Sequence, residues 1–298
     1  MKGIILAGGR GTRLYPLTKV TNKHLLPVGK EPMIFNPIRQ LVSAGIKEIL
    51  IVTSTEHMGD IVNLLGSGGQ FGVDFTYKVQ ETAGGIAHAL RLGENFANKE
   101  KIVVVLADNI AVKSIKPYID NFRKQKTGAR VLLKEVSEPT RYGIAALDEQ
   151  KIVEIEEKPE SPNTRFAVIG YYMYDEKVFD FIKQQTPSER GEYEITDVNN
   201  EYIKRGEMEY DILEGDWTDA GTFESLQIAN RMLLECKVEG RIKFCLSFYQ
   251  FRICANPTSF VSDSQGTNPY DEMDWSVYRV KKLNQQHTKG MLLCELYC

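Results

Sequence analysis

The first half of the chain alternates short apolar runs with stretches in which apolar residues recur every three or four positions. Continuous apolar, β-branched runs are typical of buried strands, and the longer spacing is typical of helices. After a first strand at residues 4–7, the pattern predicts helices and strands in turn. We expect strands at residues 48–53, 75–79 and 101–107, and helices at 33–44, 57–65 and 87–96.

This alternation predicts the fold class α/β, with a Rossmann-like, mostly parallel sheet flanked by helices. After residue 130 the strands become shorter, which indicates a continuation of the sheet and a smaller substrate-side region. There we expect strands at residues 131–136, 143–147, 152–156, 166–172 and 210–213, and helices at 177–184, 196–205 and 221–235.

The composition narrows the class of protein. The 298 residues are 42% hydrophobic and 26% charged, with a formal net charge of −3, which fits a globular chain of one or two domains. No general basic field would attract nucleic acid. The apolar runs are too short for a membrane span or a signal peptide, so we expect a cytoplasmic protein without a membrane partner. All five cysteines follow residue 235 without C-x-x-C spacing, and we interpret them as ordinary thiols.

The first strand runs into the loop GGRGTR, which combines flexible glycines with Arg10 and Arg13. Backbone amides and cations in such a loop can surround phosphate groups. The loop does not match the dinucleotide fingerprint, because Leu14 stands where the third glycine belongs. Nor is it a P-loop, since the nearby Gly29-Lys30 lacks a following serine or threonine. A local phosphate site and an ordinary strand-to-helix turn both stay open.

Two aspartates are candidates for a metal site, and the first stands at a predicted strand end, where open α/β sheets collect their ligands. Asp108 follows a buried strand in VVVLADN, and Asp219 lies in DWTDAGT just before the last predicted helix. Mg²⁺ takes one or two protein carboxylates and keeps several waters, so this pair could hold it beside phosphates. Aspartate is also common in turns and helix caps, so a structural role stays open for each.

A charged pair, Glu157-Lys158, ends another predicted strand just before Pro159. A carboxylate can accept hydrogen bonds from sugar hydroxyls, and a lysine can contact a phosphate. The alternative is a solvated charge cluster. Small-plus-aromatic pairs beside strands, which shape sugar pockets or simply fill the core, are Tyr142-Gly143 and Gly170-Tyr171.

Six segments occur in order along the chain: LAGGRGTRLYPLT, LADN, YGI, EEKP, GEYEITDVN and WTDAGT. Together with Lys23 they resemble the sugar-nucleotide pyrophosphorylases, a family of nucleotidyltransferases. The resemblance is most specific to short-type members that transfer a thymidylyl group from dTTP to glucose 1-phosphate. It implies the nucleotide-diphospho-sugar transferase type of fold, Mg²⁺ as cofactor and a homo-oligomer.

The resemblance also implies a domain organisation. It predicts a catalytic domain at residues 1–235, with a nucleotide-binding part at about 1–126 and a sugar-binding part at about 127–235. Residues 236–298 do not resemble the family, and we predict there an atypical, cysteine-containing tail of unknown role.

The implied reaction is the attack of a sugar phosphate on the α-phosphorus of a nucleoside triphosphate. The attacking oxygen is already an anion, so no general base is needed, and the histidines receive no catalytic role. The resemblance implies catalytic roles for Arg13, Lys23 and Asp108; nucleotide binding by Leu6, Gly8, Gly9, Gly11, Thr12, Gln80 and Gly85; sugar-phosphate binding by Tyr142, Gly143, Glu157, Lys158 and Gly170; and Mg²⁺ binding by Asp108 and Asp219.

Several positions depart from the pattern of the family. Ala107 replaces the usual glycine before the metal aspartate, and Thr218 and Ala220 differ from the common W-L-D-T-G-T. No arginine stands just upstream of this segment, so one expected phosphate contact is missing there. Two other functions stay open: uridylyl or other nucleotidyl transfer to a sugar 1-phosphate, and a non-catalytic regulatory subunit that binds nucleotide sugars.

Overall fold

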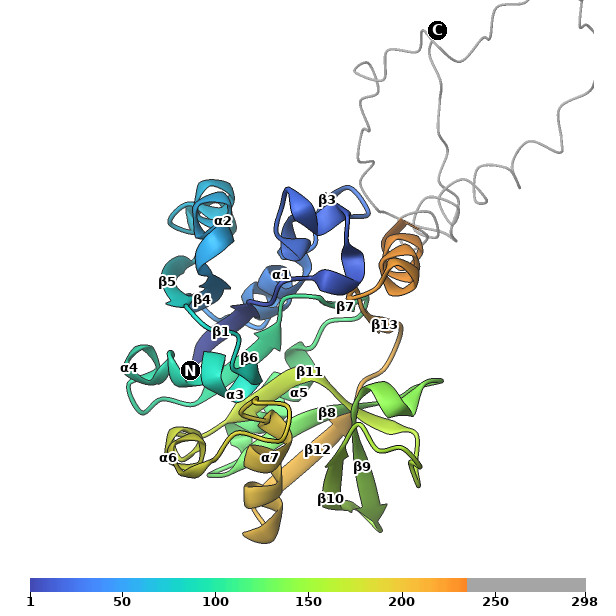
Figure 1. Ribbon diagram of the computed structural model, residues 1–298. Coiled ribbons are helices and arrows are strands. Elements are labelled where there is room, and N and C mark those ends of the chain that lie inside the picture. Colours follow the sequence, from blue (N-terminus) through green and yellow to red (C-terminus); the bar gives the residue numbers. More distant parts are fainter. Residues whose placement is uncertain (235–298) are drawn as a thin grey trace, which may run out of the picture. The chain divides into compact units, whose positions relative to one another are not determined.

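A nine-stranded sheet runs through the structure, a computed structural model that describes residues 1–234 (Figure 1). The tail predicted at residues 236–298 lies outside the described residues. The strands of the sheet are β1 Lys2–Ala7, β4 Glu48–Ser54, β5 Asp74–Gln80, β6 Ile102–Leu106, β8 Ala129–Glu135, β9 Gly143–Asp148, β10 Lys151–Glu157, β11 Phe166–Tyr174 and β12 Met208–Ile212.

The strands follow one another in space in the order β10-β9-β11-β6-β1-β4-β5, while β8 also pairs with β11 and β12 pairs with β8. From β6 to β5 the neighbours are parallel. β11 then pairs antiparallel with β6, β8 and β9, so the second half of the sheet is mixed. The predicted α/β fold, a mostly parallel sheet flanked by helices, is confirmed.

Alternate residues of the central strands enter two separate cores, one on each face of the sheet. In β1, Ile4 and Leu6 join one core, while Ile5 and Ala7 join the other. Residues of β4 and β6 divide in the same way. Successive side chains of a strand point to opposite faces, so a strand buried on both faces requires a continuous apolar run.

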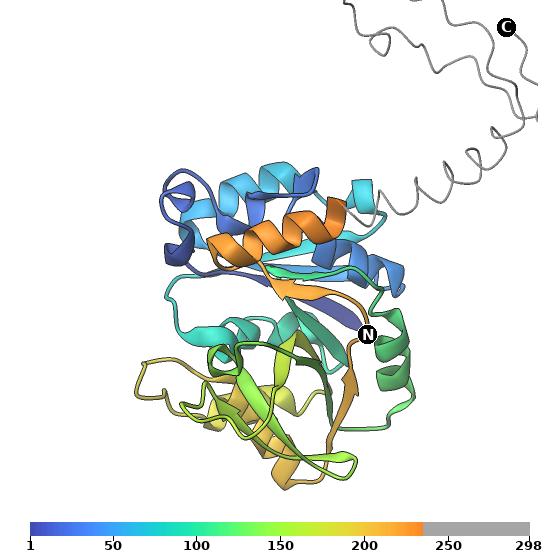
Figure 2. The same ribbon diagram turned by 90° about the vertical axis from the view of Figure 1, so that its right-hand side faces the viewer.

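Helices cover both faces of the sheet (Figure 2). One core receives residues of α1, α2 and α5, and the other receives residues of α3, α6 and α7. No helix among residues 1–234 is long and apolar enough to cross a membrane. The helices are α1 Phe35–Ser43, α2 Met58–Leu65, α3 Gly85–Arg91, α4 Glu94–Ala97, α5 Lys116–Lys124, α6 Val178–Gln184 and α7 Ile195–Lys204.

Two helices differ from the sequence-based expectation. The helix predicted at 87–96 is broken into α3 and α4, and Gly93 lies between them. A Cβ added at Gly93 would stand 2.7 Å from Cδ1 of Ile4, so the break lets the chain pass close to the sheet. The sequence does not reveal α5, because only Ile119 and Phe122 of this helix are buried. The other predicted elements are present, with ends shifted by a few residues.

A short antiparallel ladder joins β7 Asn109–Ala111 to β13 Trp217–Asp219. The chain then enters a helix at residues 223–234, coloured orange in Figure 2. Leu226 and Ala229 of this helix pack with Leu14 in a third core. The ladder and the helix therefore bind the last described segment to the first loop of the chain.

Candidate active site

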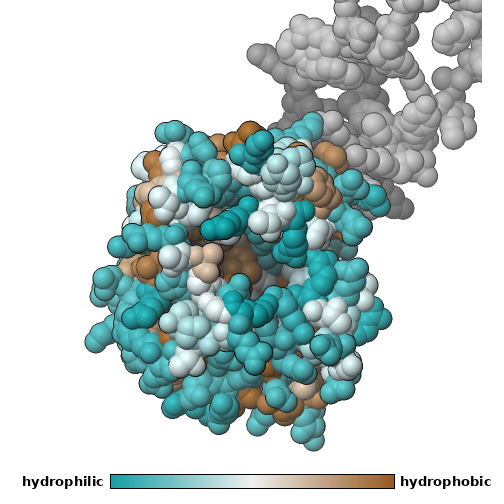
Figure 3. All heavy atoms as spheres, in the orientation of Figure 1, coloured by the Kyte–Doolittle hydropathy of each residue, from teal (hydrophilic) through white to brown (hydrophobic). Residues whose placement is uncertain are grey.

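The carboxyl ends of three parallel strands bring predicted site residues to one edge of the sheet. Gly8 follows β1, Gln80 ends β5, and Asp108 follows β6. A cavity of about 270 Å³ lies beside this edge. Figure 3 shows the same face of the molecule hollowed near its middle, with hydrophilic residues around the hollow. The lining of the cavity includes these predicted site residues: Arg13, Asp108, Tyr142, Gly143, Glu157, Lys158, Gly170 and Asp219.

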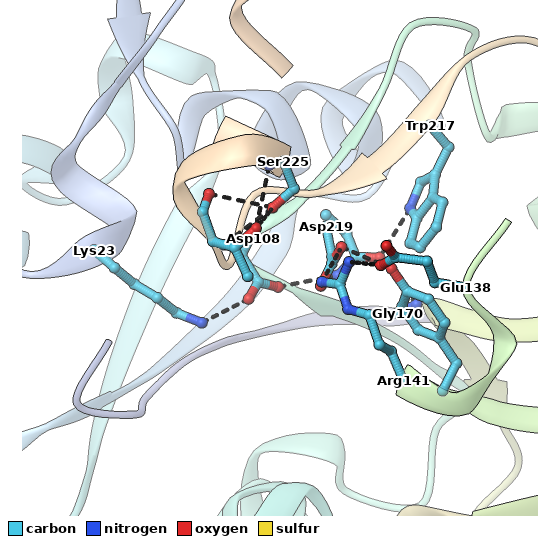
Figure 4. A network of polar contacts seen from close by, with 11 residues as sticks. Lys23, Asp108, Glu138, Arg141, Gly170, Trp217, Asp219 and Ser225 are labelled. Atoms are coloured by element: carbon cyan, nitrogen blue, oxygen red, sulfur yellow. Dashed lines mark hydrogen bonds and ion pairs between the residues drawn. The ribbon is translucent and has the colours of Figure 1, made fainter. Parts of the chain in front are cut away.

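Lys23 and Asp108 form an ion pair at this edge. Nζ of Lys23 lies 2.6 Å from Oδ2 of Asp108, and each side chain is only 14% exposed. In Figure 4, Lys23 approaches Asp108 from one side while Arg141 and Asp219 lie on the other. Burial alone would raise the pKa of Asp108, but the charge of Lys23 and the hydrogen bonds from Lys23 and Asn109 act together against burial and hold this pKa well below its usual range. Asp108 is therefore ionised at neutral pH.

The β7–β13 ladder brings a second carboxylate, Asp219, beside Asp108. In the ladder Asp219 pairs with Asn109. The hydroxyl of Tyr142 donates a hydrogen bond to Oδ1 of Asp219 at 2.8 Å, and Nη2 of Arg141 donates to Oδ2 at 3.1 Å. Burial raises the pKa of Asp219, and the negative charge of Asp108 adds to this rise. The two carboxylates are thus close enough to influence each other.

Asp108 and Asp219 could hold a metal ion together, since they are close enough for the charge of one to act on the other. Among residues 1–234, no group of three or more His, Cys, Asp or Glu side chains is arranged to hold a metal. Two carboxylates without histidine or cysteine suit Mg²⁺, which completes its octahedron with water and phosphate oxygens. A cation between the two would also relieve their mutual repulsion.

The glycine loop carries Arg13 toward Asp219. Gly11 has a φ of +60°, and a Cβ there would stand 2.7 Å from the side chain of Thr18, so this turn requires glycine. Nη2 of Arg13 lies 3.1 Å from the position that a Cβ of Gly221 would take. The charge of Arg13 opposes the rise in the pKa of Asp219, which places the guanidinium within electrostatic reach of the carboxylate.

Gln80 lies next to the beginning of the loop. Oε1 of Gln80 is 2.9 Å from the position that a Cβ of Gly8 would take. Nε2 of Gln80 donates to the carbonyl of Gly85 at 3.4 Å. Gly85 has a φ of +90°, and a Cβ there would stand 2.7 Å from the carbonyl oxygen of Tyr193. Both the backbone conformation and the close contact therefore require glycine at this position. Gly8, Gln80 and Gly85 therefore form one contact group.

A second contact group surrounds Glu157, which lines the cavity. The hydroxyl of Thr196 donates to Oε2 of Glu157 at 2.5 Å, and Nη2 of Arg190 donates to Oε1 at 3.4 Å. Nζ of Lys158 lies 3.5 Å from Oε1 of Glu157. The backbone N–H of Lys158 donates to the carbonyl of Tyr142 at 3.0 Å. Three of the predicted sugar-side residues, Tyr142, Glu157 and Lys158, are thus connected to one another.

Asn109 connects the aspartate pair to the wall of the cavity. Oδ1 of Asn109 accepts hydrogen bonds from the backbone N–H of Gly170 at 3.0 Å and from Nε1 of Trp217 at 2.9 Å. Nδ2 of Asn109 donates to Oδ1 of Asp108 at 3.0 Å. A Cβ at Gly170 would stand 2.5 Å from Nδ2 of Asn109, so glycine leaves room for this amide.

Three predicted nucleotide-binding residues take no part in these side-chain contacts. The side chain of Leu6 is 6% exposed within the core, and its carbonyl accepts a hydrogen bond from the N–H of Ala107. Gly9 and Thr12 are exposed in the loop. Four further residues belong to the site and lie in or beside the segments that the sequence analysis singles out: Asn109, Arg141, Arg190 and Thr196.

His24, next to Lys23, is buried and uncharged. It is 1% exposed, and Nδ1 lies 2.7 Å from Oδ1 of Asn22. Burial, reinforced by the charge of Lys23, lowers the pKa of His24 to about 3. The neutral ring thus contacts the amide of Asn22 through Nδ1.

This shift predicts a pH-dependent stability. Between about pH 3 and pH 6.5 the unfolded chain binds a proton at His24 that the folded chain does not bind, so stability falls as the pH drops. At pH 5 we expect a loss of about 2 kcal/mol relative to pH 8 from this residue alone. Urea unfolding at both pH values should show a smaller difference for His24→Gln than for the unchanged protein. An equal difference in the two proteins would contradict the neutral, buried imidazole.

At one edge of the parallel sheet, the fold and these contacts combine a glycine loop with cationic and carboxylate side chains, as in proteins that bind phosphate groups. The chain belongs to the nucleotidyl transferase family: the family model matches residues 2–235, the stretch that contains every site residue described above. The predicted enzyme class is confirmed.

Several relatives carry more specific names. The glucose-1-phosphate thymidylyltransferase of Neisseria meningitidis is 43% identical over 233 residues, which are 77% of this chain and 81% of the relative. The enzyme of the same name from Xanthomonas campestris is 40% identical over 250 residues, which are 82% of this chain and 84% of the relative.

Two solved structures are similar as well. A Bacillus anthracis protein provisionally assigned as a glucose-1-phosphate thymidylyltransferase, solved with a sucrose, is 56% identical with a TM-score of 0.76, and the match covers 78% of this chain and 95% of that one. A UDP-glucose pyrophosphorylase solved with UDP-glucose is 26% identical with a TM-score of 0.70 and coverages of 84% and 99%. The predicted family and type of fold are confirmed.

Proposed function

We propose that the protein transfers the thymidylyl group of dTTP to glucose 1-phosphate, giving dTDP-glucose and pyrophosphate. The observation that carries the proposal is the ion pair of Lys23 with Asp108, whose carboxylate lines the cavity together with Arg13 and Asp219. The names of relatives about 40% identical over most of the chain support the choice of substrates.

The proposed reaction is a displacement at phosphorus. A phosphate oxygen of glucose 1-phosphate attacks the α-phosphorus of dTTP, a new P–O bond forms, and the bond to the β-phosphate oxygen breaks as pyrophosphate leaves. Positioning and charge neutralisation then do most of the work, since the nucleophile is already an anion. Lys23 would neutralise the reacting phosphates, and Arg13 would hold the departing pyrophosphate. His24, buried and neutral, would not act as a base.

The two contact groups beside the ion pair would receive the two substrates. On the nucleotide side, Gln80 would meet the base with its amide, and the backbone N–H groups of the loop would face the phosphates. Leu6, Gly8, Gly9, Gly11, Thr12 and Gly85 would complete that side. On the other side the glucose 1-phosphate would contact Tyr142, Gly143, Glu157, Lys158 and Gly170.

Mg²⁺ is the proposed cofactor, held by Asp108 and Asp219. Such an ion would supply positive charge to the phosphate oxygens on which negative charge accumulates. We expect EDTA to abolish turnover and excess Mg²⁺ to restore it. Asp219→Asn should raise the Mg²⁺ concentration needed for half-maximal turnover by about tenfold, because one charged ligand is lost.

Asp216, which is exposed and precedes β13, offers a matched control. Asp216→Asn should leave the Mg²⁺ requirement unchanged when pyrophosphate release is followed in a metal titration. Full activity in EDTA, or an unchanged requirement in Asp219→Asn, would refute the proposed metal site.

A substrate panel tests the proposal against its alternatives. Pyrophosphate release should be measured with dTTP, UTP, CTP, ATP and GTP, each with glucose 1-phosphate and with mannose 1-phosphate. We expect the highest kcat/KM for dTTP with glucose 1-phosphate, and UTP as the nearest rival, because one methyl group changes discrimination by about 1–3 kcal/mol. A preference for UTP would favour uridylyl transfer. No release with any pair would favour a regulatory subunit. The homo-oligomer stays a prediction from the resemblance, and the cytoplasmic location stays a prediction from the apolar runs of the sequence.

A further inference from the structure

His88, to which neither the sequence analysis nor the proposed reaction gives a role, contacts the amide of Gln80. It lies on α3, and its Nδ1 is 3.2 Å from Nε2 of Gln80. The same Nε2 lies 3.4 Å from the carbonyl oxygen of Gly85. Gln80 is only 9% exposed, so its amide has few directions in which to find partners.

These two contacts fix the orientation of the amide. A backbone carbonyl can only accept a hydrogen bond, so the side of Gln80 that faces Gly85 must be the NH₂ group. The second hydrogen of that group then points to Nδ1 of His88, which accepts it when the ring carries its proton on Nε2. Both donors of Gln80 are thereby used. Only Oε1, which lies beside Gly8, stays available to a ligand.

Gly84 and Tyr193 lie next to the ring of His88. A Cβ at Gly84 would stand 2.5 Å from Nδ1 of His88, so glycine leaves room for the ring. The ring centroid lies 6.0 Å from that of Tyr193, and the backbone N–H of Tyr193 donates to the carbonyl of Gly84 at 2.8 Å. The glycine at position 84 therefore provides the space in which Nδ1 of His88 reaches Gln80.

We infer that His88 is a positioning residue that selects the base by holding Gln80 with its acceptor toward the nucleotide. Thymine and uracil carry a hydrogen on N3 that Oε1 can accept, whereas N3 of cytosine is an acceptor and would face another acceptor. The inference rests on the proposed function, since it requires a pyrimidine nucleotide at Gln80. It adds the reason why this glutamine discriminates between bases that have similar shapes.

Two substitutions separate this role from simple packing. His88→Leu keeps a side chain of similar bulk, but this side chain has no hydrogen-bond acceptor. His88→Asn is smaller, but its Oδ1 stands as many bonds from the backbone as Nδ1 does and can accept the same hydrogen bond. The experiment measures kcat and KM for dTTP and CTP, and the KM for glucose 1-phosphate, in both variants and in the unchanged protein.

In His88→Leu we expect the ratio of kcat/KM for dTTP to that for CTP to fall about tenfold, which is the effect of one hydrogen bond. The loss should appear as a higher KM for dTTP, with kcat and the KM for glucose 1-phosphate within about twofold. His88→Asn should restore most of the ratio.

The outcomes distinguish the two claims. If the unchanged protein prefers dTTP but His88→Leu keeps the same ratio, the inference about His88 is wrong and the proposed function stands. If the dTTP-to-CTP ratio falls equally in both variants, His88 acts through packing and the inference is also wrong. The same holds if kcat falls and the KM for glucose 1-phosphate rises with it. If the unchanged protein turns over no pyrimidine nucleotide, the proposed function fails and the inference fails with it.

Discussion

Asp108→Asn is expected to lower kcat by about a thousandfold or more. The substitution removes the charge that pairs with Lys23 and would bind the metal, and it leaves the shape of the side chain nearly unchanged. Asparagine can still accept the hydrogen bond of Lys23 through its Oδ1, but its NH₂ group then faces Nδ2 of Asn109 and that hydrogen bond is lost, so we expect the unfolding free energy to fall by about 2 kcal/mol. Pyrophosphate release gives the rate, and urea unfolding gives the stability.

Asp120→Asn provides the control for this variant. Asp120 is a partly exposed residue of α5 that pairs with Lys116 and Arg123 on the same helix. Its substitution should leave kcat and both KM values unchanged, because exposed pairs of this kind contribute little. More than a tenth of the original kcat in Asp108→Asn, in protein freed of contaminating enzyme, would contradict the central role of this carboxylate.

Lys23→Met should have the next largest effect, a fall in kcat of about a hundredfold or more. Methionine fills much of the same volume but brings no charge to the reacting phosphates. It also leaves Asp108 without its cation at a site where each side chain is 14% exposed, so stability should fall by about 3 kcal/mol. The assay therefore belongs at a temperature where circular dichroism shows the variant to be folded.

Lys30→Met is the matched control, because Lys30 is exposed between the short strands β2 Pro27–Val28 and β3 Glu31–Pro32. This variant should keep its turnover. Equal kcat values for Lys23→Met and Lys30→Met would show that the ammonium of Lys23 has no part in the reaction.

The sequence predicts the strands and the edge of the sheet well, for a physical reason. Strands buried on both faces require continuous apolar runs, and these runs mark β1, β4 and β6 directly. Parallel strands end at the same edge, so Gly8, Gln80 and Asp108 could be grouped from their positions after strands alone. What the sequence could not supply is any distance between them.

The pairing of Asp219 with Asp108 could not be derived from spacing. It depends on the ladder of β7 with β13, two strands of three residues each from distant parts of the chain, and such short strands leave no clear period in the sequence. The residue types and the resemblance to a family indicate that these two aspartates could share Mg²⁺, but neither indicates the ladder that brings them together. The break at Gly93 was missed for a similar reason, because it follows from contact with Ile4 in the sheet.

The sequence also does not predict which cationic side chains contact Asp219 and Glu157. The segment before WTDAGT contains no arginine, yet Arg141 donates to Asp219 from a turn that precedes β9. Arg190 reaches Glu157 from the loop before α7. Partners of this kind depend on tertiary contacts between distant segments, whereas the positions of Glu157 and Lys158 at a strand end were visible in the sequence.

The most direct test of the account follows the α-phosphorus of dTTP. The protein is incubated with Mg²⁺, glucose 1-phosphate and dTTP labelled with ³²P at the α-position, and the products are separated by chromatography. The account predicts that the label appears in dTDP-glucose, with one unlabelled pyrophosphate released for each molecule formed. Label that stays in dTTP, or that appears as dTMP without dTDP-glucose, would contradict transfer to the sugar phosphate.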